Sequence, residues 1–158
     1  MRRKAPAIAL ALAAALLAAC GNSGTGSTPA ACLSDVAAYR QALAAAPGEV
    51  RLGGATPISG CLVEGQSGGE LAQVGQAMVL AATQLNETAR KDPTGPAAVQ
   101  LGYLIGAAQQ GASTTGGIHS DLIRRLDTAA RFTPGGGTLP ADFERTFGEG
   151  YAAGQRSG

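Results

Sequence analysis

The amino-acid sequence predicts an all-α fold, a small bundle of about four to five helices with one irregular loop. Apolar residues recur every three or four positions in several segments, which is the period of an amphipathic helix. Stretches rich in Gly and Pro separate these segments, and only one short extended piece is expected, at 50–52. The length of 158 residues suits a single domain.

The first helix is expected to end at Pro47-Gly48, and either Ser34 or Asp35 can cap its N-terminus. Its apolar positions are Leu33, Val36, Tyr39 and Leu43. Residues 49–62 carry several Gly and Pro residues without helical periodicity, so we expect the irregular loop there.

The second helix carries the strongest local signal. Ser67-Gly68-Gly69-Glu70 matches a capping box, with Ser at the N-cap and Glu three residues later. The apolar stripe behind it consists of Leu71, Val74, Met78, Ala81 and Leu85. The helix should run to about Arg90, before Asp92-Pro93.

Three further helices are expected, from Pro96 to Gly111, from Ile118 to Ala130, and from Pro140 through Tyr151. In the first of these, Gly102 and Gly106 form a Gly-x-x-x-Gly pair, which we interpret as a close approach of two packed helices. In the second, Asp121 with Arg125 and Asp127 with Arg131 are spaced for ion pairs between positions i and i+4. Abundant Ala and Gly indicate closely packed helices around a thin core.

Composition excludes several classes of function. The net charge is +1, so no basic surface points to a nucleic-acid partner, and we expect none. Three Cys and one His cannot supply both a four-ligand zinc site and a disulfide. No phosphate loop, dinucleotide fingerprint or haem motif occurs. We therefore expect no metal site and no cofactor.

The N-terminus has the features of an export signal. Met1-Arg2-Arg3-Lys4 is basic, and the next 15 residues carry no charge, which is short of the roughly 20 that cross a bilayer as a helix. The stretch ends in Leu17-Ala18-Ala19-Cys20, which resembles the lipobox of bacterial lipoprotein precursors. That resemblance implies diacylglyceration of the Cys20 thiol and cleavage just before it. The alternative is an ordinary secretory signal in which Cys20 is incidental.

The resemblance covers the first 21 residues and implies an organisation for the rest. Residues 1–19 would be the signal peptide, 20–31 the lipidated Cys with a flexible Gly- and Ser-rich linker, and 32–158 the helical domain. The lipid bilayer would be a partner through acylated Cys20. The mature chain would sit on the outer face of the cell membrane, or at the outer membrane of a Gram-negative source. Without Arg2, Arg3 and Lys4, 9 basic residues stand against 11 acidic ones, so acyl chains rather than charge would hold it.

If Cys20 is lipidated, Cys32 and Cys61 are the possible intramolecular pair, and an exported protein meets oxidising conditions. A disulfide would close a loop of about 30 residues. The alternative is two buried free thiols.

Two further patterns point to chemistry. Gly65-Gln66-Ser67-Gly68-Gly69 matches the nucleophile elbow of hydrolases, with His119 as the sole candidate base. We favour Ser67 as a helix cap and His119 as a surface or capping residue, because the family's parallel sheet is not expected here. The six Tyr and Phe residues are interpreted as core, although they could line a cavity.

The sequence therefore favours a non-enzymatic binding or structural module at the cell envelope, whose protein partner it does not name. The alternatives are a small-molecule carrier and a cryptic serine hydrolase using Ser67. A carrier would need a cavity above about 300 Å³ with converging polar groups.

Overall fold

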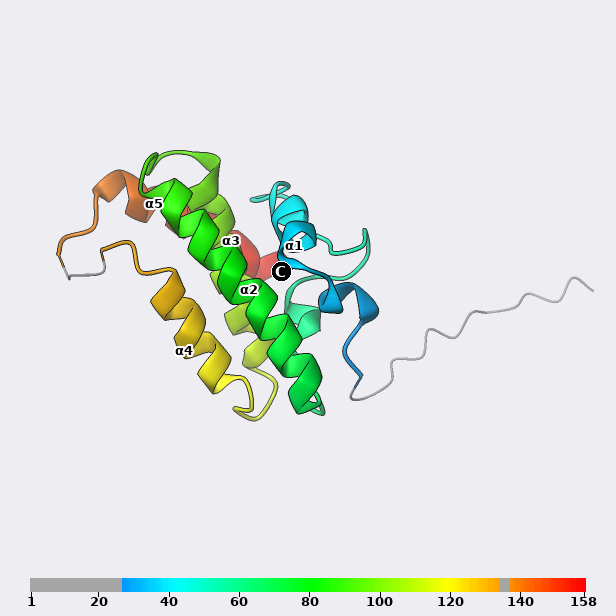
Figure 1. Cartoon of the computed structure of the whole chain (residues 1–158). Helices are drawn as coiled ribbons and strands as arrows, with labels where there is room; N and C mark the ends of the chain where they lie inside the picture. The colour runs from blue at the N-terminus through cyan, green and yellow to red at the C-terminus, as the bar shows by residue number, and fades with distance from the viewer. Residues whose placement is uncertain (1–26, 134–136) are drawn as a thin grey trace, which may run out of the picture.

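The computed structural model describes residues 27–133 and 137–158 (Figure 1). Within these ranges the chain is helical, and its β-structure is one isolated bridge between Leu52 and Thr56. The predicted all-α fold is confirmed. The predictions for residues 1–19, for Cys20 and for the linker up to residue 26 lie outside the described residues.

Two short 3₁₀ helices and five α-helices follow one another along the described chain. They are η1 (Ala30–Leu33), α1 (Val36–Leu43), η2 (Ser59–Cys61), α2 (Gly68–Ala89), α3 (Pro96–Ala112), α4 (Ser120–Ala129) and α5 (Ala141–Ser157). The second, third and fourth predicted helices are confirmed to within two residues at each end. The last helix begins as predicted but continues past Tyr151 to Ser157. The irregular loop between α1 and α2 is confirmed as well.

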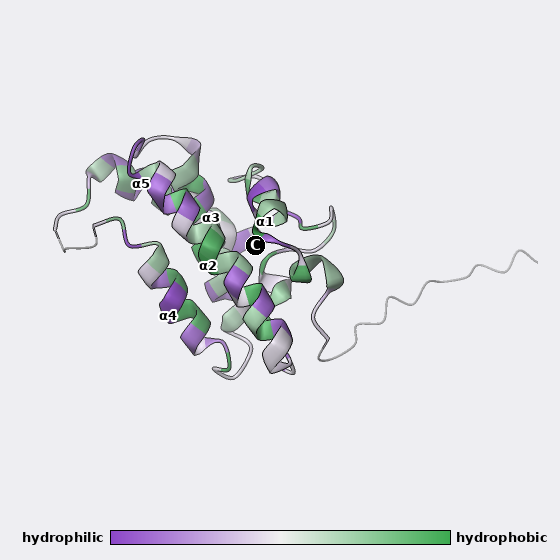
Figure 2. Ribbon diagram, viewed as in Figure 1, coloured by the Kyte–Doolittle hydropathy of each residue, from purple (hydrophilic) through white to green (hydrophobic). Residues whose placement is uncertain are grey.

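Helix α3 is the centre of the bundle. It packs against α5, α2, α4 and η2, and most of its residues are buried on every side. In Figure 1, α2 crosses in front of α3 and α5, α4 lies along one side of α2, and α1 with η1 lies on the other side. Figure 2 shows α4 with alternating apolar and polar patches, because only one face of this surface helix is buried, through Leu122 and Leu126.

The most extensive contact between two helices of the described chain joins α3 and α5. Gly102 and Gly106 of α3 face the backbone of α5 at Phe147 and Tyr151, and Gly150 and Gly154 of α5 face the backbone of α3. A Cβ atom at any of these four positions would overlap a carbonyl oxygen of the partner helix. The predicted close approach at the Gly-x-x-x-Gly pair is confirmed, between two helices of the same domain.

The predicted start of the domain is wrong by several residues. The linker was expected to reach residue 31 and the domain to begin at residue 32, yet Thr28 is buried and η1 begins at Ala30. The first α-helix is also shorter than predicted. Asp35 caps it, accepting from the Ala38 N–H at 3.0 Å, and turns replace the helix after Leu43. Residues 28–31, which are Thr, Pro and two Ala, are ordered because the region of the disulfide supplies a partner such as Gln66 for Thr28, which composition does not reveal.

The ion pairs predicted on α4 are wrong in detail. Asp121 pairs with Arg124, one position earlier than predicted. Arg125 instead extends toward Gly75 of α2. Asp127 accepts from the Gln109 amide at 3.4 Å. Arg131 lies beyond the C-cap of α4, so the spacing of a continuous helix no longer applies to it.

Candidate functional site

A disulfide joins the two 3₁₀ helices and confirms the predicted pairing. Cys32 of η1 and Cys61 of η2 are both buried, with their Cα atoms 5.4 Å apart. The phenol of Tyr39 donates a hydrogen bond to the Cys32 carbonyl at 2.8 Å. Burial raises the pKa of the Tyr39 phenol, so this donor keeps its proton. The disulfide fixes the N-terminal segment against the loop that precedes α2.

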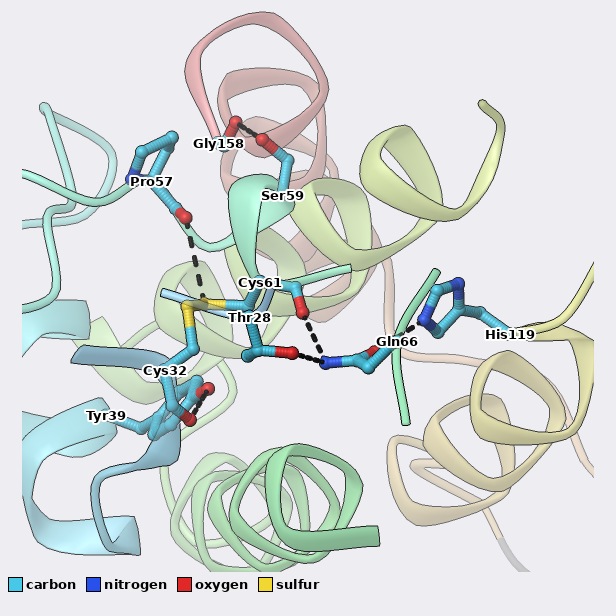
Figure 3. Close-up of a disulfide and its surroundings, with 9 residues drawn as sticks. All are labelled: Thr28, Cys32, Tyr39, Pro57, Ser59, Cys61, Gln66, His119 and Gly158. Carbon is cyan, nitrogen blue, oxygen red and sulfur yellow. Dashed lines mark hydrogen bonds between the residues drawn. A yellow bond between two sulfur atoms is a disulfide. The ribbon is translucent and has the colours of Figure 1, made fainter. Parts of the chain in front are cut away.

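A buried cluster of polar side chains lies beside the disulfide (Figure 3). Its centre is Gln66, in the turn just before α2. The Gln66 amide nitrogen donates to the Cys61 carbonyl at 3.0 Å and to the Thr28 hydroxyl oxygen at 2.8 Å. Because a backbone carbonyl can only accept, this contact fixes which end of the Gln66 amide is nitrogen. The Gln66 oxygen therefore points the other way, toward His119.

His119 completes the cluster from the start of α4, and its side chain is fully buried. Its Nε2 lies 2.7 Å from the Gln66 Oε1, and its Nδ1 lies 2.7 Å from the Thr115 hydroxyl oxygen. The Thr115 hydroxyl also lies 2.8 Å from the Ala112 carbonyl. Burial lowers the pKa of the imidazole, so its neutral form is favoured at neutral pH.

Both nitrogens of the imidazole have a hydrogen-bond partner whether the ring is neutral or charged. Nε2 must carry a proton, because the Gln66 oxygen can only accept. In the neutral ring, Nδ1 accepts from the Thr115 hydroxyl. In the charged ring, Nδ1 donates to that oxygen and the hydroxyl turns to the Ala112 carbonyl. One hydroxyl rotation therefore separates the two states.

The predicted role of His119 is wrong. We expected a surface or capping residue, but the side chain is buried and makes no cap hydrogen bond to α4. Sequence reasoning also missed Thr28, Gln66 and Thr115. The available signal was weak: Thr115 precedes His119 by one helical turn, and the other two are polar residues in Gly- and Ser-rich surroundings.

Ser67 forms the predicted capping box at the start of α2. Its hydroxyl oxygen accepts from the Glu70 backbone N–H at 3.3 Å, and the Glu70 carboxylate accepts from the Ser67 backbone N–H at 3.2 Å. The Ser67 hydroxyl donates to the same carboxylate at 2.9 Å. These hydrogen bonds lower the pKa of the Glu70 carboxyl group, and the bond from the Ser67 hydroxyl has the largest effect.

Ser67 and His119 do not form the pair that a hydrolase requires. The Ser67 hydroxyl donates to Glu70, and both imidazole nitrogens of His119 contact other residues, Gln66 and Thr115. Gln66 separates the two side chains, although it is the immediate neighbour of Ser67. In this geometry Ser67 and His119 are therefore not paired as nucleophile and base.

An apolar groove lies where α3, the end of α4 and the start of α5 meet. It encloses about 540 Å³, and its charged residues are Asp127, Arg131 and Glu144. Its apolar lining comprises Ile105, Ala130, Phe132, Leu139, Phe143 and Phe147. Three aromatic rings follow one another there, with centroid distances of 4.0 Å from Phe132 to Phe143 and 5.6 Å from Phe143 to Phe147. Tyr39 and Tyr103, by contrast, are buried in the core as expected.

No group of three or more His, Cys, Asp or Glu side chains within 27–133 and 137–158 is placed to hold a metal ion. Among the helices of these ranges, none is both long and apolar enough to cross a membrane. Comparisons with known protein families, curated proteins and solved structures found no match to the chain.

Proposed function

We propose that this protein is a bacterial lipoprotein, anchored through acylated Cys20, whose helical domain is a non-enzymatic binding or structural module at the cell envelope. The observation that carries the proposal is the Leu17-Ala18-Ala19-Cys20 ending after a basic start and a short apolar stretch. Two acyl chains or more would be needed for stable anchoring, since each buried CH₂ contributes about 0.8 kcal/mol.

The disulfide supports export. Cys32 and Cys61 form a buried bond, and such bonds persist in oxidising compartments outside the cytosol. The chain has three Cys residues, and Cys20 is the one that the disulfide leaves available as the acyl acceptor.

The folded domain would lie close to the membrane in this arrangement. Within the described ranges the first buried side chain is that of Thr28, eight residues after Cys20. At no more than about 3.6 Å per residue, these eight residues span at most about 29 Å. A partner would therefore meet the domain near the bilayer surface, and we propose an envelope protein as that partner.

Metabolic labelling with an alkyne fatty acid tests the anchor. The wild-type chain should take up the label and sediment with membranes. Cys20→Ser should lose both properties, whereas Cys32→Ser/Cys61→Ser should keep the label because it leaves the lipobox intact. A Cys20→Ser protein that is still labelled and still sediments with membranes contradicts the proposal.

The apolar groove favours a second candidate function, a carrier of small apolar molecules. Its volume of about 540 Å³ falls within the range of roughly 300–1,000 Å³ typical of ligand sites. An apolar fluorescent probe such as N-phenyl-1-naphthylamine tests this candidate. Saturable binding that Phe132→Ala weakens, and that Ile118→Ala at an exposed apolar residue outside the groove leaves unchanged, would support it. Equal binding to both variants would contradict it.

A further inference from the structure

We propose that His119 is a proton sensor that controls how firmly residues 28–31 are held on the helical domain. The proposal rests on the geometry of the cluster in Figure 3, where Gln66 lies between Thr28 and His119. Acidification would protonate the buried imidazole, and the domain would relieve the buried charge by releasing Thr28 and admitting water.

The cluster can take up the proton without losing a hydrogen bond. Both ring nitrogens keep their partners when the Thr115 hydroxyl turns from Nδ1 to the Ala112 carbonyl. The Ala112 carbonyl already accepts from the Thr115 backbone N–H at 3.2 Å, so it is satisfied in either state. Protonation inside the fold is therefore opposed by charge burial rather than by broken contacts.

No opposite charge offsets that burial. Both contacting side chains, Gln66 and Thr115, are neutral, and none of the ion pairs found in the described ranges includes His119. Helix α3 has no charged residue. The charged residues of the other elements around the cluster, α2, α4 and the turn before α2, are Glu64, Glu70, Glu87, Asp121, Arg124, Arg125 and Asp127. All of these except Glu70 are exposed. Glu70 is engaged by Ser67 and, with a smaller effect on its pKa, by the Thr28 hydroxyl, so it meets the cluster at Thr28 and makes no hydrogen bond to the imidazole.

The disulfide determines which part of the chain can open. Cys32 is bonded to Cys61, so the chain after Cys32 stays attached to the loop before α2. On the N-terminal side of Cys32, the Thr28 hydroxyl is held by the Gln66 amide and by the Glu70 carboxylate. Residues 28–31 are therefore the segment next to the cluster that can move while the helices remain packed.

The sign and size of the effect follow from proton linkage. The closed domain holds His119 with a lowered pKa, whereas in the opened state the ring would approach its ordinary value of about 6.5. Opening then takes up one proton. As pH falls from about 6.5 toward the lowered pKa, the opened fraction should rise about tenfold per pH unit.

The sole His in the chain makes the test direct. NMR of residues 21–158, with the disulfide intact, follows the imidazole carbon-bound protons between pH 8 and pH 5. This range keeps most carboxylates ionised. Hydrogen exchange over the same range follows the Cys32 backbone amide, which donates to the Pro29 carbonyl at 2.9 Å and should lose this bond when residues 28–31 are released. We expect an imidazole midpoint below 6.5 and a parallel fall in protection of the Cys32 amide, with protection in α3 unchanged.

A matched pair of variants isolates the cluster. Thr115→Val removes the hydroxyl that accepts from the charged ring, so it should lower the imidazole midpoint further. Thr114→Val removes an exposed neighbouring hydroxyl and should leave the midpoint unchanged. His119→Gln should abolish the pH dependence of protection, and Thr115→Val serves alone if His119→Gln does not fold. An imidazole midpoint at or above 6.5, equal midpoints in the two threonine variants, or pH-independent protection of the Cys32 amide would overturn the proposal.

Discussion

The backbone of Gly106 in α3 lies directly against the carbonyl oxygen of Tyr151 in α5. Gly102 makes the same approach to Phe147 one turn earlier, and the glycines of α5 reciprocate. With no side chain between them, the two helices bury their backbones against each other. This contact explains how a chain with few large apolar residues obtains a packed centre.

Alanine substitutions at two glycines of α5 should distinguish the effect of this contact on stability from the effect of helix propensity. Gly150→Ala places a Cβ against the Val99 carbonyl, so we expect a loss of stability of about 1–3 kcal/mol or more from overpacking. Gly148→Ala in the same helix meets no atom within 4 Å and should stabilise by about 0.5–1 kcal/mol. Urea unfolding of both variants measures the difference. Destabilisation of similar size in both would show that the contact is not tight.

Most of the fold could be predicted from the sequence because local signals agreed with one another. The capping box at Ser67 and Glu70 set the start of α2, and Pro96 and Pro140 marked the starts of α3 and α5. The Gly-x-x-x-Gly pair at Gly102 and Gly106 indicated a close helix contact, but spacing alone did not name α5 as its partner.

The polar cluster could not be predicted, because its members come from three separate parts of the chain. Gln66, Thr115 and His119 become neighbours only when α2 and α4 pack together around α3. A lone His in a polar stretch has the same local pattern on a surface as in a buried network. The start of the domain at Thr28 was missed for a related reason, since its stabilising contacts are all distant in sequence.

The disulfide should contribute about 3–4 kcal/mol by restricting the unfolded chain, given the sequence separation of 29 residues. Thiol counting on residues 21–158 in denaturant without reductant should find no free thiol. The double variant Cys32→Ser/Cys61→Ser should unfold at lower urea concentration. Two free thiols in the untreated protein would contradict the pairing.

The capping box should be sensitive to both of its partners. Ser67→Ala removes the capping hydroxyl and should cost about 0.5–2 kcal/mol in urea unfolding. Glu70→Ala removes the carboxylate that accepts from Ser67 and should also lower the stability. Ser67→Thr should retain most of the stability because Thr can both accept and donate. Ser67→Asp keeps an acceptor but places a second charge beside Glu70, so it should restore less. Equal stability of Ser67→Ala and wild type would argue against this cap.

Glu70 should also make the cap depend on pH. Its pKa is lower in the folded state than in the unfolded chain, so its contribution is present above the unfolded value and is lost as pH falls through the folded one. The stability difference between wild type and Glu70→Gln should therefore shrink on acidification below about pH 4.5. Thermal unfolding at a series of pH values checks this. A difference that stays constant down to pH 3 would contradict the assignment.

Mass spectrometry of the mature N-terminus tests the central claim most directly. The protein is isolated from the membrane fraction of a bacterial host, and its N-terminal peptide is sequenced. Our account predicts a chain that begins at Cys20, followed by Gly21, and that carries the mass of a diacylglyceryl group on the Cys20 thiol. An N-terminus elsewhere, or an unmodified Cys20 thiol in the mature protein, would contradict the account.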